Sequence, residues 1–198
     1  MLAKIVITTL QIVSTFYLTI VLLRFLLQLA RADFYNPISQ FVVKATNPPL
    51  RPLRKIIPAW GPIDGAALVL AILVQMVAFF FILVALNNGL PPINPLTLLL
   101  TLLTWSVITV LGLIVKIYFW SVIAVVVVSW IAPGSNHPAI QLVAQITEPV
   151  MRPVRKVMPS LGGLDLSPIV VFLILNVISV MINHMAAAAG LGSIGVAL

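Results

Sequence analysis

Long uninterrupted apolar stretches alternate along the chain with short segments rich in proline, glycine and basic residues. The apolar stretches cover residues 5–29, 66–86, 96–131 and 167–185. Each reaches the ~18 residues at which a membrane-spanning helix is the default interpretation, because a helix of about 20 residues crosses a hydrocarbon core of about 30 Å. The pattern predicts an all-α membrane protein with about four transmembrane helices.

The first and third stretches each raise a question about length. Residues 5–29 follow Lys4 and could form a cleaved signal peptide, but the apolar region exceeds the usual length of about 7–15 residues, so we interpret it as a span. Residues 96–131 would extend over more than about 50 Å as a helix, and no turn residues divide them. We expect one long helix there, tilted or bent near Gly112.

A basic segment punctuated by proline occurs twice, separated by 101 positions, at residues 51–58 and 152–159. At the same offset, identical residues recur between 36–67 and 137–168. Many of these are prolines, glycines and charges, which apolar composition would not align by accident. We infer two tandem repeats that run in the same direction, residues 1–95 and 96–198, each with a span, a basic loop and a second span.

Before each basic segment the pattern predicts a short amphipathic helix that lies in the membrane interface. Pro37, capped by Asn36, and Pro138 are suited to the first helical turn. Because the residue before a proline is pushed out of the α region, we expect these helices to stop before Pro48 and Pro149.

Asp64 and Asp165 stand where the second span of each repeat begins. A carboxylate at a helix N-terminus can cap the helix and complement its dipole, and we favour this structural role over a catalytic one. We also assign a structural role to Pro58 and Pro159, which close the two basic segments.

Four polar side chains within the predicted spans are candidates for function. Gln75 and Asn176 occupy the same position in the two repeats and predict either a hydrogen bond between the repeats or the lining of a polar pathway. For Arg24, near the end of the first span, we favour extension to the lipid headgroups over pairing with an aspartate. Lys116 either extends toward an interface or faces inward, and the sequence does not separate these two.

Composition agrees with a membrane protein, since 62% of the residues are hydrophobic and 8% charged, against about 45–50% and 25% in soluble domains. The net charge of +7 points to lipid headgroups as the nearest anionic partner, and we expect no direct nucleic-acid binding. With no cysteine, two histidines and four acids, the chain lacks an evident nucleophile–base set, phosphate loop or metal motif. We therefore expect no enzymatic activity, cofactor or metal.

Lysine and arginine gather in the first and third loops and are absent from the second loop and the tail. The positive-inside rule then predicts cytoplasmic basic loops and both termini outside. Fixing this orientation is one role of the charges, and binding of anionic lipid or of a partner protein surface is a further candidate role. The candidate residues are Arg51, Arg54, Lys55, Arg152, Arg155 and Lys156.

These motifs carry a likeness to a known family. The pattern Thr-x-Pro, then Arg-Pro-x-Arg-Lys-x-x-Pro, then Gly-x-x-Asp at the head of an apolar span resembles the YggT family in its two-repeat form, to which the YlmG proteins are related. The resemblance implies a bacterial inner-membrane protein without known enzymatic activity and with periplasmic termini. The first copy has Asn47 where the second has Glu148, so any role of Glu148 is not shared by both.

The resemblance leaves two functions open, because relatives are connected with osmotic tolerance and potassium or solute uptake, with cell division, and with cytochrome assembly in plastids. One is a membrane-organising or assembly factor, alone or as a homo-oligomer, that acts through the basic loops. The other is a component of ion or osmolyte uptake with Gln75, Asn176 and Lys116 along the route. The scarcity of polar groups in the spans favours the first.

Overall fold

The computed structural model describes residues 2–58, 60–158 and 165–194, and within these ranges the chain is helical without a β-sheet. Four helices are long and apolar enough to cross a membrane. They are α1 (Leu2–Leu29), α3 (Gly65–Asn87), α4 (Pro95–Ile131) and α6 (Ser167–Ala188). The predicted fold class is confirmed, and residues 95–131 form the single long helix expected from the sequence.

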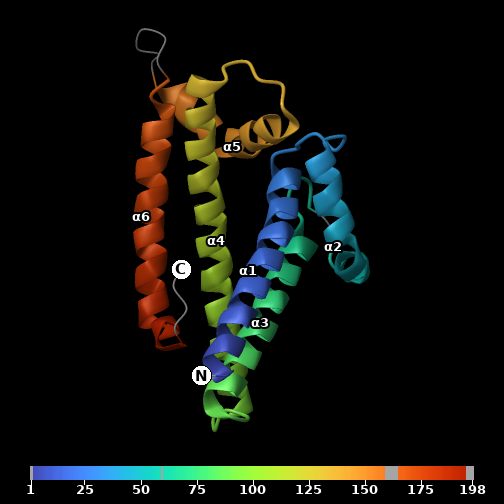
Figure 1. The fold of residues 1–198 in the computed structure, drawn as a ribbon, viewed down its shortest axis with the longest axis vertical. Coiled ribbons are helices and arrows are strands. Elements are labelled where there is room, and N and C mark those ends of the chain that lie inside the picture. The colour runs from blue at the N-terminus through green and yellow to red at the C-terminus, as the bar shows by residue number, and fades with distance from the viewer. Residues whose placement is uncertain (1, 59, 159–164, 195–198) are drawn as a thin grey trace.

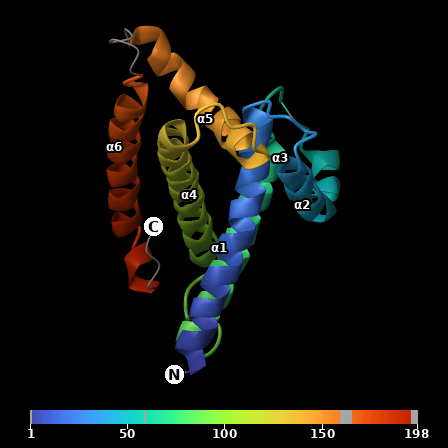
Figure 2. The same cartoon turned by 45° about the horizontal axis from the view of Figure 1, so that its top comes forward.

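The spans are arranged as two neighbouring pairs. Helix α1 packs along α3, and α4 packs along α6, while α3 and α4 join the two pairs. In Figures 1 and 2, α1 and α4 run in one direction and α3 and α6 in the other, as chain order requires. The division of the chain into two tandem repeats stays a prediction.

Two apolar clusters hold the bundle together. The larger one surrounds the last turns of α1, where Val21 and Leu22 are fully buried. The smaller one joins α3, α4 and α6 around Phe79, whose ring meets that of Trp105 edge to face. The indole N–H of Trp105 donates to the carbonyl oxygen of Ala189 at 2.7 Å, which ties the first half of α4 to the end of α6.

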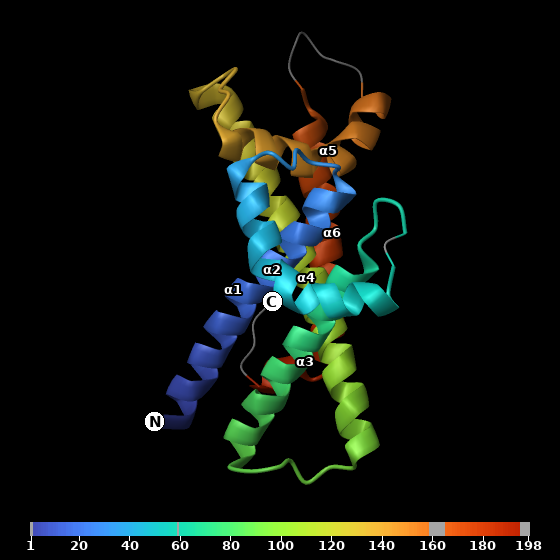
Figure 3. The ribbon, with the colours of Figure 1, turned by 90° about the vertical axis from the view of Figure 1, so that its right-hand side faces the viewer.

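The two remaining helices, α2 (Pro37–Ile56) and α5 (Pro138–Val157), are twice as long as the sequence suggested. The prediction that they stop before Pro48 and Pro149 was wrong, because both helices continue through these prolines. Figure 3 shows α2 changing direction along its length, as expected where proline removes a backbone donor.

Tertiary packing explains why these helices continue. Thr46 and Leu50, on either side of the proline pair in α2, are both buried, and so are Thr147 and Met151 in α5. The Thr46 hydroxyl donates to the carbonyl of Val42 at 2.7 Å, a local bond that helps helices bend. Burial on both sides of the prolines outweighs the lost backbone bonds.

The helices α2 and α5 occupy different places in the bundle. Helix α5 lies across one end, whereas α2 lies beside α1 (Figure 1). The loop before α2 also contacts α5, because the Asn36 amide donates to the carbonyl of Pro138 at 2.7 Å and the backbone N–H of Asp33 donates to Oε1 of Gln145 at 2.9 Å. These two bonds fasten the first half of the chain to the second.

Candidate functional site

The first basic elbow, residues 51–58 and 60–64, joins the end of α2 to the start of α3. Arg54 forms an ion pair with Asp64, whose side chain is 0% exposed. Asp64 also accepts the backbone N–H of Ala67 at 3.2 Å, so the predicted cap of α3 is confirmed. A further bond from Arg54 to Oε1 of Gln28, at 3.4 Å, extends the connection to α1.

The second basic elbow, residues 152–158 and 165, makes the corresponding ion pair before α6. The Nε of Arg155 lies 3.0 Å from Oδ2 of Asp165, and a second guanidinium nitrogen lies 3.0 Å from Oε2 of Glu148. Oδ1 of Asp165 accepts the backbone N–H of Ser167, the first residue of α6, at 2.9 Å. Asp165 therefore accepts from the first turn of α6, but the N-cap residue is Leu166 and not Asp165, whose side chain is 47% exposed.

The titration of Asp165 follows from these contacts. Burial alone raises the pKa of its carboxyl, but hydrogen bonds from Ser167 and from the Arg155 guanidinium, together with the charge of Arg155, outweigh this effect. The net result is a pKa below the ordinary value.

The six basic residues selected from the sequence divide into two kinds. The guanidinium groups of Arg54 and Arg155 are engaged with carboxylates of their own elbow. A sequence signal for this existed, since an aspartate follows each arginine after ten positions, at the head of the next span. The other four are exposed and make no ion pair with another residue in the part of the chain that the structure describes: Arg51, Lys55, Arg152 and Lys156.

Exposed aliphatic side chains accompany these free cations. Ile56 at the end of α2 is 79% exposed, and Val157, at the corresponding position of α5, is 83% exposed. Trp60 in the first elbow is exposed as well. Each elbow therefore presents cations next to an unburied apolar group, the combination found on helices that lie at a lipid interface. Of the prolines assigned to the elbows, Pro58 directly follows the C-cap residue of α2, and Pro159 lies outside the described residues.

Arg24 does not extend to the headgroups as we favoured from the sequence. Its side chain is buried, and one guanidinium nitrogen lies 3.2 Å from Oδ1 of Asn47, 3.3 Å from the carbonyl of Val43 and 3.4 Å from Oγ1 of Thr46. The sequence interpretation missed these partners because it did not include the packing of α2 along α1. Since α2 continues along α1, it brings acceptors to Arg24.

The expected hydrogen bond between Gln75 and Asn176 is not made. Gln75 is 4% exposed, and its Oε1 has no partner among the residues in the described ranges, whereas Asn176 is exposed. Gln75 belongs to α3 and Asn176 to α6, and α4 runs between these two helices in Figure 2. Their matching places in the sequence therefore correspond neither to a contact nor to equal burial.

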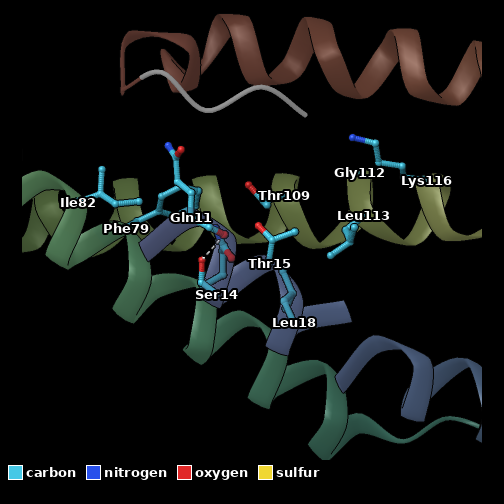
Figure 4. Close-up of a pocket in the computed structure, with 11 residues that line it drawn as sticks. Gln11, Ser14, Thr15, Leu18, Phe79, Ile82, Thr109, Gly112, Leu113 and Lys116 are labelled. Atoms are coloured by element: carbon cyan, nitrogen blue, oxygen red, sulfur yellow. Dashed lines mark hydrogen bonds between the residues drawn. The ribbon is translucent and has the colours of Figure 1, made fainter. Parts of the chain in front are cut away.

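Gln75 and Asn176 instead line two cavities that share Lys116. The first, of about 130 Å³, lies among α1, α3 and α4, and the second, of about 260 Å³, lies between α4 and α6. Figure 4 shows the first cavity, with side chains from these elements around it. Lys116 lines both cavities with a side chain that is exposed, and the choice between its two alternatives stays a prediction.

The charged residues offer no metal centre in the chain as described. Within residues 2–58, 60–158 and 165–194, no three histidine, cysteine, aspartate or glutamate side chains lie close enough to hold a metal ion. The carboxylates of the elbows are instead engaged with arginine.

The four apolar spans and the helices between them define a multi-pass α-helical membrane protein. A model of the family CCB3/YggT matches residues 3–85 and 96–186. The chain belongs to this family, as the resemblance of its motifs implied.

Relatives cover nearly the whole chain. An uncharacterized protein of Pseudomonas aeruginosa is 52% identical over 183 residues, which cover 92% of this chain and 90% of the relative. The uncharacterized protein YggT of Escherichia coli K12 is 37% identical over 181 residues, covering 91% and 90%. An uncharacterized protein of Vibrio alginolyticus is 41% identical over 157 residues, covering 79% and 82%. No solved structure matches the chain.

Proposed function

We propose that this protein is a non-enzymatic membrane-organising or assembly factor that gathers anionic lipid at its two basic elbows. The observation that carries the proposal is the set of four exposed cations that have no ion-pair partner among the described residues and that lie beside the exposed Ile56 and Val157. The membrane is the bacterial cytoplasmic membrane, with the elbows on its cytoplasmic side, in accord with the charge distribution between loops.

The energetics support binding by charge as well as by apolar contact. Each basic residue near an anionic leaflet contributes about 1 kcal/mol, so four contribute about 4 kcal/mol when their effects add. Arg51 and Lys55 are four residues apart, as are Arg152 and Lys156, and residues at this spacing lie on one face of a helix. Each elbow therefore offers a paired contact to phosphate.

The basic residues of each elbow have two different proposed roles. Arg54 and Arg155 hold the geometry through their aspartates, whereas the exposed cations are free to contact lipid. Both elbows are expected on the same side of the membrane, because each precedes a span that runs in the same direction. Two such surfaces in one chain can hold several anionic lipids near a membrane complex.

The test replaces the free cations with glutamine in one variant, Arg51→Gln with Lys55→Gln, Arg152→Gln and Lys156→Gln. Purified protein in mild detergent is titrated with phosphatidylglycerol or phosphatidylcholine, with bound lipid counted by native mass spectrometry and the environment of Trp60 followed by fluorescence. We expect selective binding of phosphatidylglycerol by the natural chain and a loss of affinity of about tenfold or more in the variant.

A matched pair of double variants separates the elbow from general charge. Arg51→Gln with Lys55→Gln removes two elbow cations, and Arg31→Gln with Lys44→Gln removes two exposed cations of the same loop outside the elbow. Equal affinity in both would contradict the elbow as the site. Unchanged lipid binding in the fourfold variant, with loss of a co-purifying membrane protein, would move the proposal from lipid to a protein partner.

A second candidate, a component of ion or osmolyte uptake, is favoured by the cavities that Gln75, Asn176 and Lys116 line. A cation route is poorly served by this lining, because its only charged side chain is a lysine. We therefore expect potassium flux into proteoliposomes to equal that of empty vesicles. Flux that scales with protein content would favour the uptake role instead.

A further inference from the structure

Lys116 is a charged side chain deep within the spans that the elbows do not use. It lies 15 residues before the last residue of α4 and 21 residues after the first. At about 1.5 Å per residue, each end of the helix is more than about 20 Å away, beyond the reach of the four-carbon stem. Its side chain is exposed and lines both cavities, so within a membrane its charge requires a compensating partner.

No carboxylate side chain can provide that partner from within the membrane. The sequence holds four acidic residues, and none of them lies in α1, α3, α4 or α6. They are Asp33, Asp64, Glu148 and Asp165. All but Asp33 are engaged with arginine in the elbows. The positive charge of Lys116 must be compensated by water or by a bound anion.

The cavity walls hold polar groups without partners. Gln75 is nearly completely buried and lines the first cavity, yet its Oε1 accepts no hydrogen bond from any residue that the structure describes. Two further atoms of the same cavity wall, Nε2 of Gln11 and Oγ1 of Thr109, also form no hydrogen bond with any residue that the structure describes. Figure 4 shows Thr109 of α4 near Thr15 of α1. Because buried polar groups in native proteins are hydrogen-bonded, these atoms indicate an occupied cavity.

The two cavities correspond in the two halves of the chain. The first cavity takes Gln11, Ser14, Thr15 and Leu18 from α1, and the second takes Gly112, Val115, Lys116 and Phe119 from α4. Each pair is separated by the same 101 positions as the basic motifs, and so are Gln75 and Asn176. Lys116 is the residue of the second cavity that corresponds to Thr15 of the first. It also lines the first cavity, so one charged side chain is shared by both cavities.

We propose that the two cavities form one intramembrane site for a small, partly hydrated inorganic anion, with the ammonium group of Lys116 as its counter-charge. The ammonium offers three donors and no acceptor, and the unpartnered Nε2 of Gln11, the hydroxyl of Thr109 and the amide nitrogen of Asn176 can add further donors. The unpartnered Oε1 of Gln75 is an acceptor and can bind a water molecule of the hydrated anion. A cation is disfavoured because the only charge on the walls is positive.

Size agrees with this class of ligand. Volumes of about 130 and 260 Å³ are well above the ~10–15 Å³ that a cavity needs to hold one water molecule, which leaves room for an anion with several waters. The site goes beyond the proposed function and uses none of the elbow residues. Its failure and the failure of lipid binding are therefore distinguishable.

The test measures chloride binding to the purified protein. Sodium chloride is titrated against sodium gluconate at constant ionic strength, with binding followed by the line width of the chloride-35 resonance and by the shift in unfolding temperature. We expect a saturable chloride effect in the natural chain. Lys116→Met should weaken it about tenfold or more, as expected when a charge-assisted bond is lost, and Gln75→Leu should weaken it several-fold.

Two controls keep the outcome decisive. Lys156→Met removes an exposed lysine of the second elbow and should leave chloride binding unchanged, whereas Lys116→Arg keeps the charge and should retain binding within a few-fold. Gel filtration and the helical circular dichroism signal identify a variant that fails to fold. A natural chain without a saturable chloride effect, or one equal to Lys116→Met, would overturn the proposal and leave the cavities filled by water alone.

Discussion

The two basic elbows make the same ion pair in different surroundings. In the first, Asp64 is completely buried, caps α3 and pairs with Arg54. In the second, Asp165 is about half exposed, and Arg155 divides its hydrogen bonds between Asp165 and Glu148. The comparison teaches that a repeated motif fixes which residues pair, whereas the surrounding helices decide how much the pair contributes to stability.

The largest effect should come from removing the buried carboxylate. We expect Asp64→Ala to lower the free energy of unfolding by about 3 kcal/mol, because it leaves Arg54 without its partner and the start of α3 without a cap. Thermal unfolding in detergent measures the change. Asp64→Asn retains a cap acceptor and removes only the charge, so a loss much smaller than that of Asp64→Ala would assign most of the effect to the cap.

The corresponding change in the second elbow should be milder. We expect Asp165→Ala to cost about 1 kcal/mol, since the pair is exposed to solvent and Glu148 still accepts from Arg155. The same unfolding experiment measures it. A cost equal to that of Asp64→Ala would show that burial does not set the difference between the elbows.

The smallest effect should appear as a dependence on pH. Because the folded protein holds the pKa of Asp165 below its ordinary value of 3.8, this carboxylate contributes stability above that value and loses it as the pH falls toward the folded pKa. Unfolding temperatures from pH 6 to pH 3 should fall slightly more steeply in the natural chain than in Asp165→Asn. Parallel curves would contradict the contribution of Asp165.

The spans were predictable from the sequence because each apolar run is long enough to cross a membrane as a helix. The lengths of α2 and α5 were not predictable, since the rule for residues before proline is local and the burial of Leu50 and Met151 is not. Only the folded chain shows that packing on both sides of a proline outweighs a missing bond.

The residues of the candidate site were predictable from the sequence, but the division into paired and unpaired cations was not fully predictable. The sequence marked six basic residues, and the aspartate ten positions after Arg54 was a signal that this arginine is engaged, but only the folded chain shows that Asp64 reaches Arg54. Equal positions in two repeats also suggested that Gln75 and Asn176 would touch. The interposed α4 prevents this, and the result is two cavities in place of one bond.

The fastening between the halves of the chain runs in one direction. The loop before α2 donates to Pro138 and Gln145, whereas the residue that corresponds to Gln145 in the first half is Lys44, which has no acceptor atom in its side chain. Because both halves belong to one polypeptide, the half that donates and the half that accepts are always the same.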